Sequence, residues 1–240
     1  MFLFLLPFSI QAATSVSGPI TSDTLWSLAQ SPYEVTGDVT VENGATLTIE
    51  PGVAVHFGPA TNLVVNAGAL RALGTTEAPI VFTSVNEPNS AAPAPGDWGA
   101  VRFLDGTVDT TTIVEHAQIR YGGGIDIQAA SPTLNFVTLS TNSGPAISMD
   151  LLSSPVGMGL QAADNDINGI LVPAGDITGT AAWQLLGIPF VVDSGVVSVG
   201  QSPTVTSVTP NEIEQGTTVD VLVNGMRLAG VESLTVSHPA

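Results

Sequence analysis

The sequence predicts an all-β protein whose main part is a three-sided parallel β-helix, or solenoid. From about residue 35 onward, short runs of β-branched and apolar residues alternate with small or polar ones, as half-buried strands require. Helical periodicity is nearly absent. One segment also matches another at a shift of 20 residues, which is about the length of one coil in such a solenoid.

The first strands are short and are separated by Gly, Pro, Asn and Asp. They are "VTV" (39–41), "LTI" (47–49), "VAVHF" (53–57), "LVV" (63–65), "IVF" (80–82) and "VRF" (101–103). The one helical exception is "SDTLWSLAQ" (22–30), where Ser22 or Asp23 could cap a single turn.

Pro51-Gly52, within "GATLTIEPGVAVHFG" (44–58), is predicted to form a solenoid corner and not a hairpin. The alternation on both sides of this corner predicts five inward side chains, Leu47, Ile49, Val53, Val55 and Phe57. It predicts four outward side chains, Thr46, Thr48, Glu50 and His56. Glu50 is then an ordinary solvated carboxylate.

The repeat aligns "VEHAQIRYGGG" (114–124) with "LNFVTLSTNSG" (134–144). The matched positions are Val114 with Leu134, Ala117 with Val137, Ile119 with Leu139, and Gly124 with Gly144. Asn-Gly or Asp-Gly pairs at 43–44, 105–106, 168–169 and 224–225 are hairpin signals that leave a β-sandwich open. The 20-residue match favours the solenoid.

A Trp-Pro-aromatic element occurs twice, as "WSLAQSPY" from Trp26 and "WQLLGIPF" from Trp183. Because solenoid ends expose core and strand edges, the two copies are predicted to be coil starts or caps. Residues 85–96, "VNEPNSAAPAPG", interrupt the coil pattern and are predicted to form a loop extruded from one corner.

Three segments follow from these patterns. Residues 1–13 have a short apolar run followed by small residues and resemble the end of a secretory signal peptide, although the positive first part is missing. Residues 20–200 form the β-helix. Residues 203–240 look like the opening of a β-sandwich module that is too short to close, so we expect a longer parent protein.

Composition excludes several classes of protein. The chain has 21 acidic and 4 basic residues, a formal charge of −17 and no cysteine. Such a charge disfavours nucleic acids and anionic membranes, and disulfides are impossible. No later run is long and apolar enough to span a membrane.

The segments "YEVTGDVTVENGATLTIEPGVAVHFG", "LVVNAGALRALGTTEAPIVFTS" and "PGDWGAVRF" resemble the bacterial right-handed parallel β-helix repeat proteins. The likeness extends from about residue 32 to 144 and, less closely, to about 199. It implies an exported or surface location and no fixed activity. The tail from residue 203 is similar to the start of an IPT/TIG immunoglobulin-like module.

Parallel β-helices include polysaccharide lyases and glycoside hydrolases, so a catalytic cluster is one expectation for this sequence. The best candidates are Asp97, Arg102, Glu115, His116 and Arg120. Arg102 and Arg120 are 18 residues apart and could face the same side one coil apart. The alternative is that the arginines and Glu115 form outward ion pairs across coils and that His116 is a corner residue.

"DNDING" (164–169) matches the first half of a Ca²⁺ loop, with Asp164, Asp166 and Asn168 as ligands. Position twelve is Gly175 where a glutamate is needed, and the same residues suit a solenoid turn. Trp98, after the extruded loop, and Tyr121 are the candidates for stacking on sugar rings.

The expected function is a non-catalytic scaffold that binds glycans or other surface polymers, or mediates adhesion, through the solenoid face. The alternative is a polysaccharide lyase or glycoside hydrolase. No cofactor is expected apart from a structural Ca²⁺.

Overall fold

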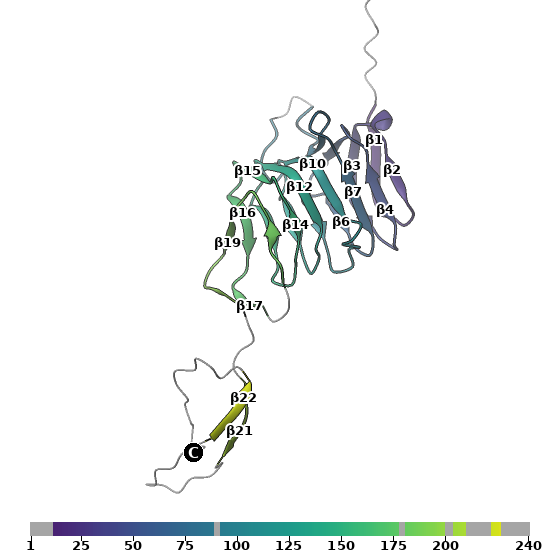
Figure 1. Ribbon diagram of the computed structural model, residues 1–240. Coiled ribbons are helices and arrows are strands. Elements are labelled where there is room, and N and C mark those ends of the chain that lie inside the picture. The colour runs from purple at the N-terminus through teal and green to yellow at the C-terminus, as the bar shows by residue number, and fades with distance from the viewer. Residues whose placement is uncertain (1–11, 89–91, 178–180, 200–203, 210–221, 227–240) are drawn as a thin grey trace, which may run out of the picture.

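The computed structural model describes residues 12–88, 92–177, 181–199, 204–209 and 222–226. The chain winds as a parallel β-solenoid of about eight turns (Figure 1). Within the described part of the solenoid every strand pairing is parallel, so the sandwich alternative is wrong there. None of the Asn-Gly or Asp-Gly pairs inside the solenoid joins antiparallel strands.

Three stacks of strands make the sides of the solenoid, which we call faces A, B and C. Face A contains the first halves of β1 (Thr14–Ile20) and β3 (Tyr33–Val41), then β5 (Ala54–Phe57), β8 (Ile80–Ser84), the second halves of β10 (Ile113–Arg120) and β12 (Thr133–Ser140), and β15 (Gln161–Ala163).

Face B contains the second halves of β1 and β3, then β6 (Leu63–Val65), β9 (Val101–Phe103), β11 (Ile125–Ile127), β13 (Pro145–Met149), β16 (Ile167–Val172) and β19 (Phe190–Val192). Face C contains β2 (Thr24–Trp26), β4 (Thr46–Ile49), β7 (Ala69–Leu73), the first halves of β10 and β12, β14 (Val156–Gly157) and β18 (Gln184–Leu185). β17 (Gly175–Ile177) pairs with β20 (Val197–Val199).

The corner at Pro51-Gly52 is confirmed. Val53 N donates to Glu50 O across it at 3.3 Å, and the five residues predicted to point inward are each 0% exposed. The four predicted outward residues are half-buried. Glu50 is more than a solvated carboxylate, because its Oε2 accepts a 2.8 Å hydrogen bond from Leu28 N of the first coil.

The 20-residue repeat is confirmed over its strands, where Val114 pairs with Leu134 and Ile119 with Leu139. The match of Gly124 with Gly144 is wrong, because Ile125 pairs with Ile147 and the shift there is 22 residues. The later coil therefore has two more residues at its corner between faces A and B.

Buried asparagines form a ladder at this same corner. Asn142 Oδ1 accepts from Gly122 N at 3.0 Å, and Asn142 Nδ2 donates to Ile119 O at 3.1 Å and to Asn165 Oδ1 at 2.9 Å. Asn165 Nδ2 in turn donates to Leu139 O and to Asn168 Oδ1, each at 2.9 Å. The ladder satisfies backbone groups that would otherwise be buried without partners.

Both Trp-Pro-aromatic elements fold alike locally. Trp26 stacks on Tyr33 at 4.9 Å between ring centroids, and Trp183 stacks on Phe190 at 5.2 Å. Trp26 lies in the first coil and Trp183 immediately precedes a strand of the last coils, which agrees with a role at the two ends. They differ in that Tyr33 starts a strand on face A and Phe190 one on face B.

Some predicted boundaries change. The predicted helical turn is a 3-10 helix, η1 (Leu28–Gln30). Its N-cap position is Ser27 and not Ser22 or Asp23, because the residues before Ser27 form β2. The solenoid strands begin at Thr14, before the expected boundary at residue 20.

The predicted extruded loop, residues 85–96, falls within the connection between β8 and β9, which spans residues 85–100. The apolar segment 1–11 lies outside the described residues.

Two strands are described in the tail. β21 (Thr204–Thr209) pairs antiparallel with β22 (Leu222–Met226). Asn224-Gly225 lies inside β22 and not at a turn, since Asn224 pairs with Ser207. The rest of the expected immunoglobulin-like module lies outside the described residues, so that resemblance stays a prediction from sequence.

The asparagine ladder gives a stability prediction. Asn142→Ala would leave Gly122 N buried without the partner it has in the wild type, at a cost of about 1–3 kcal/mol, and would also remove the hydrogen bonds from Asn142 Nδ2 to Ile119 O and Asn165 Oδ1. We expect urea unfolding to show a loss of about 2–4 kcal/mol in the free energy of unfolding. Asn135→Ala is the matched control, because it removes one exposed hydrogen bond, from Met158 N to Asn135 Oδ1. Equal losses in the two variants would contradict a stabilising ladder.

Candidate functional site

The five catalytic candidates lie in different parts of the solenoid. Arg102 is on β9 of face B and Arg120 is at the end of β10 on face A, so the expectation that they share a side is wrong. Glu115 and His116 lie where β10 passes from face C to face A. Asp97 lies at the end of the extruded loop. One turn of the solenoid from Arg102 takes 24 residues and ends at Asp126, so a spacing of 18 residues ends on a different face.

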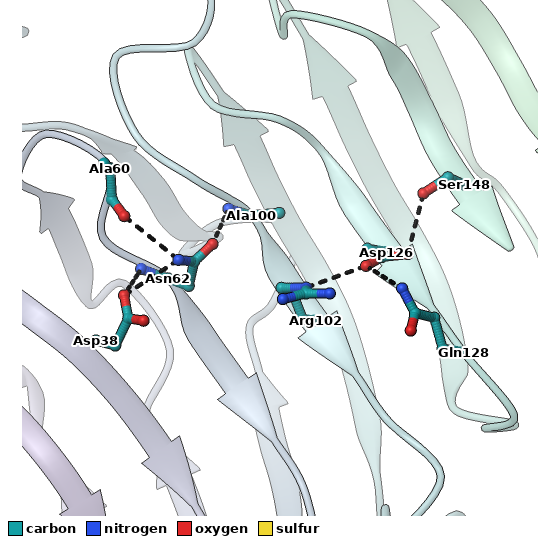
Figure 2. A network of polar contacts seen from close by, with 8 residues as sticks. All are labelled: Asp38, Ala60, Asn62, Ala100, Arg102, Asp126, Gln128 and Ser148. Carbon is teal, nitrogen blue, oxygen red and sulfur yellow. Dashed lines mark hydrogen bonds and ion pairs between the residues drawn. The ribbon is translucent and has the colours of Figure 1, made fainter.

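Arg102 pairs with an acidic residue that sequence reasoning did not single out (Figure 2). Its Nε lies 3.0 Å from Asp126 Oδ2, on the adjacent strand and in register. Asp126 also accepts from Gln128 Nε2 at 2.9 Å and from Ser148 Oγ at 3.2 Å. Figure 2 also shows a neighbouring bridge at the corner that precedes this face, where Asn62 links Asp38 to Ala100 N. Arg102 is thus part of an outward ion pair across coils, as the alternative predicted.

Arg120 forms the second ion pair, with Glu87 at the base of the loop. Its Nε lies 3.0 Å from both Glu87 carboxylate oxygens and its Nη2 lies 3.0 Å from Oε2. The same guanidinium donates from Nη1 to Gln118 Oε1 at 2.6 Å. Neither ion pair uses Glu115.

Half-buried His56 lies beside this pair on face A, in register with Glu34 and Thr83. Burial lowers the pKa of His56, while the negative charges of Glu87 and Glu34 oppose that effect and Arg120 adds to it.

Asp97 closes the extruded loop. Its Oδ2 accepts from Ser84 Oγ at 2.6 Å, Asn86 Nδ2 at 3.0 Å and Ala94 N at 3.1 Å. Burial raises the pKa of Asp97, but these three hydrogen bonds together bring it below the ordinary value. This geometry fits an anchor for the loop.

Trp98 is buried, so the prediction that it stacks on sugar rings is wrong. It is 2% exposed, stacks on Phe57 at 4.1 Å between centroids and donates from Nε1 to Arg120 O at 2.9 Å. It occupies the space beside Gly122, where a Cβ would come within 2.4 Å of the indole. Tyr121 is half-buried at the corner and stays a candidate for sugar stacking.

The three candidate calcium ligands lie at a solenoid corner. Asn168 Oδ1 accepts from the Asn165 side chain as the last rung of the ladder, and Asp166 Oδ2 accepts from Gly144 N at 2.8 Å. Asp164 has a left-handed backbone, with φ of 57°. Across the described part of the chain, no three His, Asp or Glu side chains are grouped so as to hold a metal ion. These contacts favour the interpretation of residues 164–169 as a solenoid turn. Calcium binding stays a prediction from the sequence, and the geometry gives no argument for it.

Sequence reasoning missed an open groove at the corner between faces C and A. It has a volume of about 530 Å³. The residues that line it are Thr75, Thr76, Pro79, His116, Ala117, Gln118, Phe136, Thr138, Gly159 and Gln161. No Asp, Glu, Lys or Arg is among them, although the chain carries a formal charge of −17.

Two aligned rows of side chains shape the groove. Gln118, Thr138 and Gln161 are in register on β10, β12 and β15, so their side chains repeat at the spacing of about 4.8 Å between strands. Beside them the His116 and Phe136 rings stack at 4.8 Å and 7°. Phe136 is 45% exposed.

Phe136 lies against Gly159, where a Cβ would come within 2.4 Å of the ring. The ring can adopt this position because the next coil has no side chain there. The 20-residue shift already aligned His116 with Phe136 and Gln118 with Thr138, so the signal was present in the sequence. The positive φ of His116, 45°, confirms that it is a corner residue.

The fold and groove define a parallel β-solenoid with a hydroxyl- and amide-lined surface that contains no Asp, Glu, Lys or Arg. Residues 18–149 match the family described as the pectate-lyase like beta helix domain. The match covers more than half of the chain, which therefore belongs to this family.

The chain is also similar to "Protein bark beetle" of Drosophila melanogaster, with 41% identity over 91 residues. That alignment covers 37% of this chain and 3% of the fly protein, so the chain spans only a small part of that relative. No solved structure is significantly similar to the chain. The described residues contain no helix long and apolar enough to cross a membrane.

The Asp97 anchor predicts an acid-sensitive contribution to stability. Because the folded-state pKa is lowered, the carboxylate stabilises the fold at pH above the ordinary aspartate pKa, and this contribution is lost as pH falls through the lowered value. Asp97→Asn should therefore destabilise the protein near neutral pH, and its difference in unfolding free energy from the wild type should stay constant down to about pH 5 and narrow as pH falls further, through the ordinary aspartate pKa of about 3.9 and the lowered value.

Urea unfolding at each pH measures this difference. Asp105→Asn, at an exposed corner, is the control and should track the wild type. A constant difference between Asp97→Asn and the wild type across the range would contradict the anchoring role.

Proposed function

We propose that the chain is a non-catalytic scaffold that binds glycans or related surface polymers through the groove between faces C and A. The observation that carries this proposal is the row of Gln118, Thr138 and Gln161 beside the exposed edge of Phe136. Hydroxyl and amide side chains donate and accept hydrogen bonds, as sugar hydroxyls require. An aromatic side chain adds an apolar contact for the carbon face of a sugar.

An exported or cell-surface location is part of the same proposal. It rests on the signal-like apolar segment at the start of the sequence and on the resemblance to exported β-helix repeat proteins. Adhesion through bound surface glycans is the role that such a scaffold would serve.

The catalytic alternative, a polysaccharide lyase or hydrolase, would need an acid and a base converging on one substrate bond. Of the candidates, Arg102 and Arg120 are held in separate ion pairs, and Asp97 is held by three hydrogen bonds from the loop and β8. This distribution favours the binding proposal over the catalytic one.

The groove gives a direct test by glycan array and by titration of the best ligands. Phe136→Ala should weaken glycan binding about tenfold, a loss of about 1.4 kcal/mol, because it removes the exposed aromatic surface. Leu152→Ala is the matched control, since Leu152 is 70% exposed and lies outside the groove. If no glycan binds in the presence of either calcium or chelator, the proposal is wrong. Equal weakening by the two variants would place the binding site elsewhere.

A further inference from the structure

A cation that contacts one of the groove residues is already neutralised. Arg120 does not line the groove, but its Nη1 contacts Gln118, which does. Glu87 receives three contacts from the same guanidinium, all at 3.0 Å. The remaining positive charge of Arg120 is therefore poorly placed to attract an acidic ligand.

Arg120 also fixes the hydrogen-bonding direction of Gln118. A guanidinium has donors only, so the Gln118 atom that faces it must be the amide oxygen. The amide nitrogen of Gln118, with its two donor hydrogens, is then left for the groove. Thr138 offers a hydroxyl on the next coil and Gln161 an amide on the one after.

We propose that the groove selects an extended neutral glycan over a polyuronate, and that the Glu87–Arg120 pair sets this selectivity by withholding positive charge from the ligand. This inference rests on the proposed glycan binding. A uronate carboxylate in the groove would lose water with no Lys or Arg side chain in the lining to replace it, which is costly. A neutral sugar chain needs only the hydroxyl and amide groups that the three coils repeat at about 4.8 Å, close to the advance per sugar of an extended pyranose chain.

Glu87→Gln is the charge-switch test. The amide oxygen that this substitution introduces can still accept from Arg120, so the orientation of Gln118 is kept while the guanidinium charge is no longer balanced. Binding is measured with neutral oligosaccharides (cello-, manno- and galacto-) and with oligogalacturonates of the same length, in chelator so that calcium cannot bridge. The wild type should bind the neutral chains at least tenfold more tightly than the uronates.

In Glu87→Gln the affinity for oligogalacturonates should rise about tenfold and fall again with added salt, as expected for a newly exposed charge. Neutral binding should stay within twofold. The double variant Glu87→Gln/Arg120→Gln should lose the gain in oligogalacturonate affinity, because the guanidinium charge is removed. An NMR titration should show a lower His56 pKa in Glu87→Gln than in the wild type, because Glu87 opposes the lowering.

Asp126→Asn is the matched control. It releases Arg102 in the same way, from a pair of similar exposure on face B and away from the groove. If Asp126→Asn gains as much uronate binding as Glu87→Gln, or if the wild type prefers uronates, the selectivity inference is overturned while glycan binding stands. If neither neutral nor acidic chains bind any variant, the proposed function itself is overturned.

Discussion

The structure depends on the backbone hydrogen bonds that join each coil to the next in parallel register. Every strand of the solenoid is short, and no coil can bury its apolar side chains alone. Once the register is set, equivalent side chains lie above one another, so one inward residue per coil becomes a continuous core column and one outward residue becomes a surface row. The asparagine ladder, the His116–Phe136 stack and the Gln118–Thr138–Gln161 row all follow from this rule.

Many of the carboxylates serve the same joining of coils. At corners, where the strand ladder is interrupted, an acidic side chain accepts from a backbone amide of the adjacent coil, which gives a charge-assisted hydrogen bond. The pairs are Asp23 with Thr46 N, Asp38 with Asn62 N, Asp109 with Ser131 N, Asp150 with Ala129 N and Asp166 with Gly144 N. Part of the acidic composition is therefore structural, which explains why carboxylates that look catalytic or metal-binding in sequence are already engaged.

The uncharged groove stands out against this acidic background. Several of its side chains come from outward positions of successive coils, and the arginine that contacts its Gln118 is held by a glutamate from the extruded loop. The loop thus influences the groove through Glu87 and Arg120 without lining it, which links the least regular part of the solenoid to the surface proposed to bind glycans.

The alternation of apolar and small residues, the Pro51-Gly52 corner and the 20-residue repeat were sufficient to predict the solenoid, the inward residues and the local pairing of β10 with β12. These features depend on neighbours in sequence or on one regular period. The sequence did not predict that Trp98 fills the space beside Gly122, that Arg102 pairs with Asp126, or that Arg120 pairs with Glu87. Those contacts depend on how many residues each corner and loop inserts between successive strands. That number sets which side chains of adjacent coils lie next to each other, and it is visible only in the tertiary structure.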